Sequence, residues 1–197
     1  MNKKAVAAMK EFLEALGIDL IAEGMEKTPE RVAKMYAYLF QGCGVDPASV
    51  WKEAFSTDSQ GMVMVKDIPF YAMCEHHLVP FFGAVHIAYL PHDGRVAGFS
   101  KFTDIVAVFS RRPQLQERMT KQIAEAVKDG LLAEGVLVIV EATQLCMTMR
   151  GEMAQGTKTI TIEKRGVFSD QTQLAHEAWS MLMKGKNECN EAAFAKI

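Results

Sequence analysis

The chain has 197 residues, of which 49% are hydrophobic and 23% charged, so it is long enough to bury one sizeable core and has an ordinary globular composition. A net charge of −2 with acids and bases well mixed argues against a nucleic-acid or a membrane partner, and no apolar run reaches the roughly 18–20 residues that span a bilayer. Charge interrupts the N-terminus too early for a secretory signal, and four cysteines without a regular framework favour a reducing compartment, so we expect a cytoplasmic protein.

The first part of the chain is predicted to be helical. Apolar side chains recur at helical spacing over residues 3–16. Thr28-Pro29 marks the start of a second helix that runs to about Gly42, and Asp46-Pro47 starts a short third one. We therefore expect residues 1–55 to form an N-terminal helical region, a subdomain or arm that packs on the main domain.

From residue 62 the hydrophobic period changes to that of strands. Helices and strands separated by turn signals predict an α+β fold, with a largely antiparallel four-stranded sheet and two long helices on one face. The main domain is expected to span residues 56–185, and residues 186–197 to form a C-terminal tail. The expected strands cover 62–71, 81–90, 136–149 and 156–162, and the expected helices 102–111, 113–132 and 171–184.

A candidate metal site lies in the run Cys74-Glu75-His76-His77. A thiol and an imidazole three residues apart can place two ligands on one side of a short turn, and tetrahedral zinc prefers nitrogen and sulfur donors. The best candidate for a third ligand is Cys146, in the strand-like run 136–149. Three protein ligands would leave one position for an activated water, as in catalytic zinc sites. The alternative is that both cysteines are buried simply as small hydrophobic side chains.

Taken together, the motifs resemble those of the GTP cyclohydrolase I family. The resemblance implies a tunnelling fold assembled as a toroid, commonly a homodecamer made of two pentamers, with active sites between subunits. It also implies that a guanine nucleotide is the substrate, and that GTP is converted to 7,8-dihydroneopterin triphosphate with release of formate. The matching segments run in family order over about residues 5–183: 24–32, 65–68, 73–83, 85–91, 98–101, 111–118, 146–151 and 156–159.

The resemblance also implies roles for residues around the metal. Cys74, His77 and Cys146 match the zinc ligands, where Zn²⁺ would lower the pKa of a water so that hydroxide attacks C8 of the purine. His76 matches the adjacent proton-transfer residue, a task that suits imidazole because its pKa lies near neutrality.

Other matched residues would hold the substrate. Glu117 matches the carboxylate that accepts hydrogen bonds from the guanine N1–H and 2-amino group, and Gln116 beside it is expected to support the base. Ser100, Lys101 and Arg150 match part of the triphosphate pocket. The alternative interpretation is that Glu117 and Lys101 are ordinary exposed helix charges and Ser100 a helix cap.

Two departures from the family pattern fall on functional positions. Gln144 stands where the family has a histidine thought to transfer protons in the later hydrolytic steps, and an amide cannot act as an acid or base at neutral pH. Asp104 stands where the family has an arginine on the phosphates. These departures motivate a second hypothesis, a diverged paralogue that stops at the ring-opened formamidopyrimidine or uses a guanine compound with fewer phosphates. A third hypothesis is a zinc-binding or oligomerising partner without catalysis.

Overall fold

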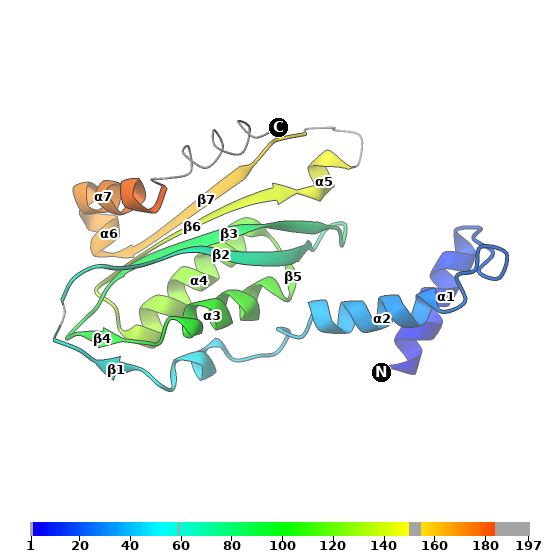
Figure 1. The fold of residues 1–197 in the computed structure, drawn as a ribbon, viewed down its shortest axis with the longest axis horizontal. Coiled ribbons are helices and arrows are strands. Elements are labelled where there is room, and N and C mark those ends of the chain that lie inside the picture. Colours follow the sequence, from blue (N-terminus) through cyan, green and yellow to red (C-terminus); the bar gives the residue numbers. More distant parts are fainter. Residues whose placement is uncertain (1, 59, 150–154, 184–197) are drawn as a thin grey trace, which may run out of the picture.

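A five-stranded sheet in the order β5-β2-β3-β6-β7 forms the centre of the molecule (Figure 1). The computed structural model describes residues 2–58, 60–149 and 155–183. Neighbouring strands are antiparallel except β5, which pairs parallel with the end of β2. The strands are β2 (Val63–Cys74), β3 (Pro80–Leu90), β5 (Pro113–Gln114), β6 (Gly135–Gln144) and β7 (Thr159–Gly166).

The α+β class is confirmed, but the four-stranded antiparallel sheet and two element boundaries were wrong. Pro113, expected to open a helix, lies instead in the two-residue strand β5 beside Met73. A strand this short has no readable period of its own, so only the tertiary contact with β2 defines it. The strand expected over 136–149 stops at Gln144, and Cys146 lies in the one-turn helix α5 (Leu145–Thr148).

Helices cover both faces of the sheet. On one face, α3 (Ser100–Ser110) and α4 (Gln116–Leu131) enclose the main core, as the sequence predicted. The short 3₁₀ helix η1 (Pro47–Trp51) adds the buried Trp51 ring to that core. On the other face, α6 (Val167–Asp170) and α7 (Thr172–Met183) pack on a second, smaller apolar cluster. A two-stranded sheet of β1 (Phe55–Ser56) and β4 (Arg95–Val96) lies at the edge.

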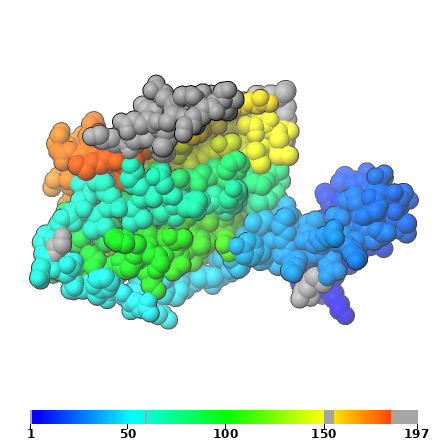
Figure 2. All heavy atoms as spheres, in the orientation of Figure 1, coloured from blue at the N-terminus to red at the C-terminus, as the bar shows by residue number. Residues whose placement is uncertain are grey.

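The N-terminal helices α1 (Lys3–Ala15) and α2 (Thr28–Leu39) form an arm that projects from the body (Figure 2). The two helices pack on each other, yet α1 has no buried residue and α2 buries only Pro29. The arm is joined to the body by a hydrogen bond from the Tyr36 hydroxyl to the Leu78 carbonyl (3.2 Å) and by the Arg111 guanidinium over the Tyr38 ring (4.3 Å). In the described part of the chain, no helix is both long enough and apolar enough to cross a membrane.

Gly83 allows β3 to pair closely with β6 near the predicted metal site. A Cβ built on Gly83 would lie 1.9 Å from the Glu141 carbonyl oxygen, so Gly83→Ala would force the strands apart. We expect this substitution to lower the free energy of unfolding by about 1–3 kcal/mol, as other overpacking changes do, measured by urea denaturation. Gly98→Ala is the matched control, because its Cβ would meet nothing within 4 Å. Equal stability of the two variants would contradict the close pairing.

Candidate metal centre

The ends of three strands bring the predicted metal ligands together. β2 and β6 both run antiparallel to β3, so both end beside its first residues, with Met73 paired to Pro80 and Gln144 paired to Phe81. Cys74 is the last residue of β2, and Cys146 follows two residues after the end of β6. Residues 72 positions apart in the sequence therefore meet at one edge of the sheet.

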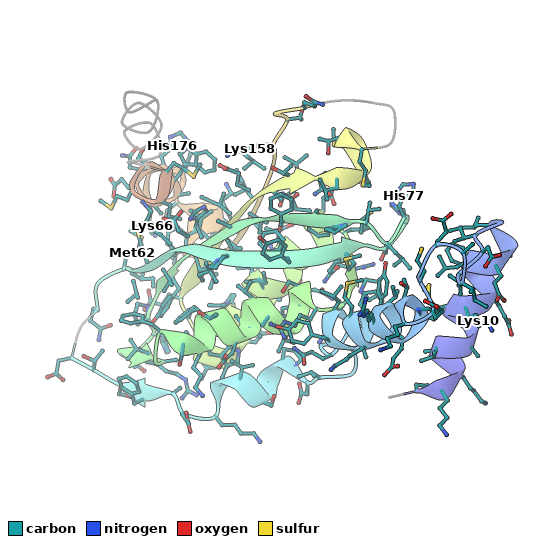
Figure 3. All side chains as sticks on the ribbon, turned by 45° about the vertical axis from the view of Figure 1, so that its right-hand side comes forward. Lys10, Met62, Lys66, His77, Lys158 and His176 are labelled. Atoms are coloured by element: carbon teal, nitrogen blue, oxygen red, sulfur yellow. The ribbon has the colours of Figure 1, made fainter. Side chains whose placement is uncertain are left out.

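A tight turn between β2 and β3 carries the third donor, His77. The turn is closed by hydrogen bonds from the Cys74 amide to the Val79 carbonyl (2.9 Å) and from the Leu78 amide to the Cys74 carbonyl (2.8 Å). Leu78 adopts a left-handed backbone conformation (φ 51°), which a non-glycine residue takes up only when its surroundings impose it. Figure 3 shows His77 at the end of the sheet that faces the arm.

The donor atoms of Cys74, His77 and Cys146 all lie within 4.8 Å of one another. The three residues differ in exposure: Cys74 is buried, Cys146 half-buried and His77 exposed. Two thiols and one imidazole at this spacing fit a metal ion with a preference for sulfur and nitrogen. The geometry brings together the three residues that the sequence singled out as ligands.

A partly buried ion pair connects helix α4 to the turn between β2 and β3. The Arg118 guanidinium forms a short contact with the Glu75 carboxylate and also donates to the Pro113 carbonyl (3.1 Å) and the Gln114 side chain (2.9 Å). The other Glu75 oxygen lies 4.0 Å from Nε2 of His76. Glu75 thus links the helix to His76, a connection that was not predicted from the sequence. Both Glu75 and Arg118 fall within the matching motifs, which was the only signal for them.

Gln144 and Gln116 meet behind the metal site. The Gln144 amide donates to the Gln116 side-chain oxygen (2.7 Å), and Gln144 Oε1 lies 3.9 Å from the Cys146 sulfur. Gln116 is only 5% exposed, and its own amide is bonded to β6 and β7. Within one protomer, Gln116 therefore faces the strands and Gln144, whereas its neighbour Glu117 is exposed on the first turn of α4.

Ser100 and Lys101 lie away from the three candidate metal ligands Cys74, His77 and Cys146. Both stand at the start of α3, beside β4, whereas the cluster lies beside β5, which follows the other end of that helix (Figure 1). An α-helix of this length spans about 16 Å. The structure thus does not join these residues to the cluster within one protomer. Arg150, also predicted to bind phosphate, lies outside the described residues.

Two acidic side chains, Glu53 and Asp104, lie near Lys101. Its ammonium lies 2.8 Å from the Glu53 carboxylate, and this hydrogen bond, more than the charges of Glu53 and Asp104, raises the pKa of Lys101 against the opposing effect of burial. The same hydrogen bond lowers the pKa of Glu53. The two carboxylates outweigh the single ammonium, so the group carries a net negative charge, which is unfavourable for a polyphosphate.

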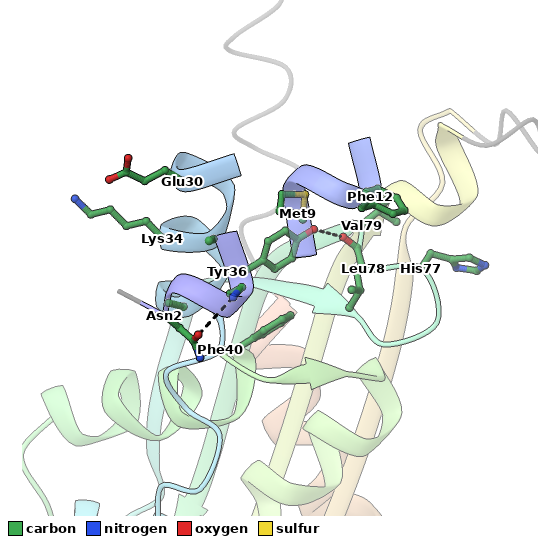
Figure 4. A pocket seen from close by; sticks show the side chains of 13 residues that line it. Asn2, Met9, Phe12, Glu30, Lys34, Tyr36, Phe40, His77, Leu78 and Val79 are labelled. Atoms are coloured by element: carbon green, nitrogen blue, oxygen red, sulfur yellow. Dashed lines mark hydrogen bonds between the residues drawn. The ribbon is translucent and has the colours of Figure 1, made fainter. Parts of the chain in front are cut away.

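An open hollow of about 1240 Å³ separates the arm from the β2–β3 turn (Figure 4). His77, Leu78 and Val79 line one side, and residues of α1 and α2, including Met9 and Tyr36, line the other. The lining is largely apolar and carries one lysine, Lys34, beside Glu30, so it does not suit a triphosphate.

Comparison with known proteins identifies the family. A sequence model described as GTP cyclohydrolase I matches residues 5–183. GTP cyclohydrolase 1 of Streptococcus agalactiae serotype Ia is 51% identical over 184 residues, covering 93% of this chain and 98% of that protein. The enzyme of Streptococcus pyogenes serotype M18 is 51% identical over 183 residues, covering 93% and 94%. This chain belongs to the GTP cyclohydrolase I family, as its motifs indicated.

A solved structure was also found to be similar. The archaeosine synthase QueF-Like in the apo form aligns with a TM-score of 0.47 and 20% identity, over 55% of this chain and 97% of that chain. The family assignment rests on the sequence matches above.

Proposed function

We propose that this protein is a zinc-dependent GTP cyclohydrolase I that forms 7,8-dihydroneopterin triphosphate and formate from GTP. The observation that carries the proposal is the convergence of Cys74, His77 and Cys146 in a chain about 51% identical to GTP cyclohydrolase 1 over nearly its whole length. Zinc is the ion that suits this sulfur and nitrogen donor set, and when bound it would supply an activated water and polarise the reacting carbon.

The protein's own residues would then orient the substrate and move protons. Glu117, exposed at the start of α4, would accept hydrogen bonds from the guanine N1–H and 2-amino group, and adenine would leave this acceptor unpaired. His76, beside His77 on the turn with ring centroids 6.1 Å apart, would take up and deliver protons at the purine ring.

The active site in this proposal combines two protomers. Ser100 and Lys101 stand at the end of α3 that is remote from the candidate metal ligands of the same chain, so in this proposal a neighbouring protomer would supply them together with Arg150. The projecting arm and the edge strand β7, with Ile160 47% and Ile162 46% exposed, leave apolar surface for such contacts. These features support a homo-oligomer, for which the family's homodecamer is the proposed form.

A second candidate is a paralogue that uses a guanine compound with fewer phosphates. It is favoured by the two acids near Lys101, because Glu53 and Asp104 together outweigh the charge of Lys101, one of the two cations expected to meet the triphosphate. Gln144 in place of a proton-transferring histidine favours a variant that stops at the ring-opened formamidopyrimidine.

A comparison of substrates separates GTP from a guanine compound with fewer phosphates. Zinc-loaded protein is incubated with GTP, GMP or guanosine, and kcat/KM is obtained from formate release. We expect GTP to be preferred by at least about tenfold over GMP, because charge-assisted phosphate contacts each contribute more than 1 kcal/mol. A higher kcat/KM for GMP or guanosine would replace the proposed substrate with the less phosphorylated one.

A further inference from the structure

A hydrogen-bond network joins α4, β6 and β7 directly behind the metal site. The Gln116 Nε2 atom donates to the carbonyl oxygens of Val140 (3.0 Å) and Thr159 (3.1 Å) and lies 3.2 Å from the Thr161 hydroxyl. The Thr159 hydroxyl donates to Gln116 Oε1 at 2.7 Å. Gln144 is the member of this network that lies nearest to the metal ligands.

The backbone carbonyls fix which way each amide points. A carbonyl oxygen only accepts hydrogen bonds, so the side of Gln116 that meets Val140 and Thr159 has to be its NH₂ group. Gln116 Oε1 then faces away from these carbonyls and accepts from its other neighbours. One of those is Gln144, which therefore has to present its own NH₂ group to Gln116, at 2.7 Å.

This polarity turns the carbonyl oxygen of Gln144 toward the Cys146 side of the metal site. Gln144 Oε1 lies 3.9 Å from the Cys146 sulfur, which as a metal-bound thiolate would have no proton to donate. Reversal of the Gln144 amide would place its oxygen 2.7 Å from the Gln116 oxygen, where the two would repel each other. Only one orientation of the Gln144 amide is therefore compatible with this contact. Gln144 is only half-buried, so part of its side chain remains accessible from the solvent.

We infer that Gln144 contacts the substrate directly, with its carbonyl oxygen as a hydrogen-bond acceptor for an N–H or O–H group of the reacting purine, and that Gln116 is the positioning residue that fixes this orientation. The inference rests on the proposed function for the identity of that substrate. It assigns Gln116 a role through Gln144 and not through direct contact with the base. The reaction would then depend on the polarity of Gln144 and not on its ability to exchange a proton.

Substitutions at position 144 can remove or reverse the hydrogen-bond donor and acceptor of Gln144. They therefore test whether the reaction needs the acceptor in its fixed orientation. Gln144→Met keeps the length but removes both the donor and the acceptor. Gln144→Glu keeps the acceptor but sets a carboxylate oxygen against Gln116 Oε1. In Gln144→His, a neutral imidazole can donate one N–H to Gln116 and present its other nitrogen as the acceptor, so the polarity of the glutamine is preserved.

The kinetic test compares these variants with GTP at constant zinc occupancy. We expect Gln144→Met and Gln144→Glu to lower kcat/KM by about tenfold to a hundredfold, the size of one lost or opposed buried hydrogen bond. Gln144→His is expected to retain at least half of the wild-type kcat/KM, and Gln173→Met, which removes an exposed amide on α7 outside the network, to remain within about twofold. Unchanged kinetics in Gln144→Met would overturn the inference.

A second readout does not depend on turnover. In ¹⁵N NMR spectra, the side-chain amide protons of Gln144, assigned by their loss in Gln144→Met, are expected to exchange with solvent at least about tenfold more slowly than those of the exposed Gln173. Gln116→Met should abolish this protection and Thr161→Val should preserve it. Rapid exchange in the wild-type protein would overturn the fixed orientation. A wild-type protein that forms no formate but has a protected Gln144 amide would instead refute the proposed substrate and reaction.

Discussion

His77→Ala is expected to lose its bound metal and more than about a thousandfold of its formate release from GTP. Cys74 and Cys146 would remain as two thiols without the nitrogen donor that completes the site. A Lewis acid contributes several kcal/mol to such a reaction, and each 1.36 kcal/mol corresponds to a factor of ten in rate. Metal content measured by mass spectrometry and formate release measured on the same sample test the two effects together.

His92→Ala is the matched control for this substitution. His92 follows the end of β3 opposite to the candidate metal ligands, and its ring lies near Asp93 and Glu134. We expect this variant to keep both metal and activity within about twofold of the wild type. A fully active His77→Ala protein would show that the three donors do not form the catalytic metal site.

His76→Gln is expected to lower kcat by about a hundredfold to ten-thousandfold with little loss of metal, because a general acid–base contribution has this magnitude. In the proposed reaction, His76 would carry the proton transfer that a second histidine would otherwise share, because Gln144 cannot exchange protons. The His76 side chain is 62% exposed and lies 4.0 Å from Glu75, so its replacement leaves the core untouched. The kcat and the metal content of both proteins, measured on the same samples, separate a loss of proton transfer from a loss of metal.

His176→Gln on α7 controls for the loss of an exposed imidazole. It should have wild-type kcat and metal content. If His76→Gln kept its full rate, proton transfer would have to be assigned to another group.

Local sequence patterns predicted most of the elements that position the site. Alternating apolar residues located β3 to within one residue, and Thr28-Pro29 located the start of α2. The ligand set followed from chemistry, because Cys74 and His77 needed a third soft donor and Cys146 stood at the end of a buried segment. The strand pairing then explains why these distant positions meet: β2 and β6 both end beside the start of β3.

Features defined by tertiary contacts could not be predicted in this way. β5 is a strand only because it lies beside Met73, and Cys146 leaves the strand because β6 ends where its partner β3 begins. The resemblance implied that Gln116 supports the base, and its hydrogen bonds to the backbone of β6 and β7 in this protomer are an additional feature that no sequence pattern indicated. No sequence pattern pointed to the ion pair of Glu53 with Lys101, which joins residues 48 positions apart.

The most direct test of the central claim is a single time course with GTP, in which formate and 7,8-dihydroneopterin triphosphate are quantified by mass spectrometry in the same reaction. We predict that the two products accumulate in equal amounts from the start, which would mean that the metal site with His76 completes every step despite Gln144. A ring-opened formyl compound that accumulates without formate would contradict this account and identify the protein as an enzyme that stops at ring opening.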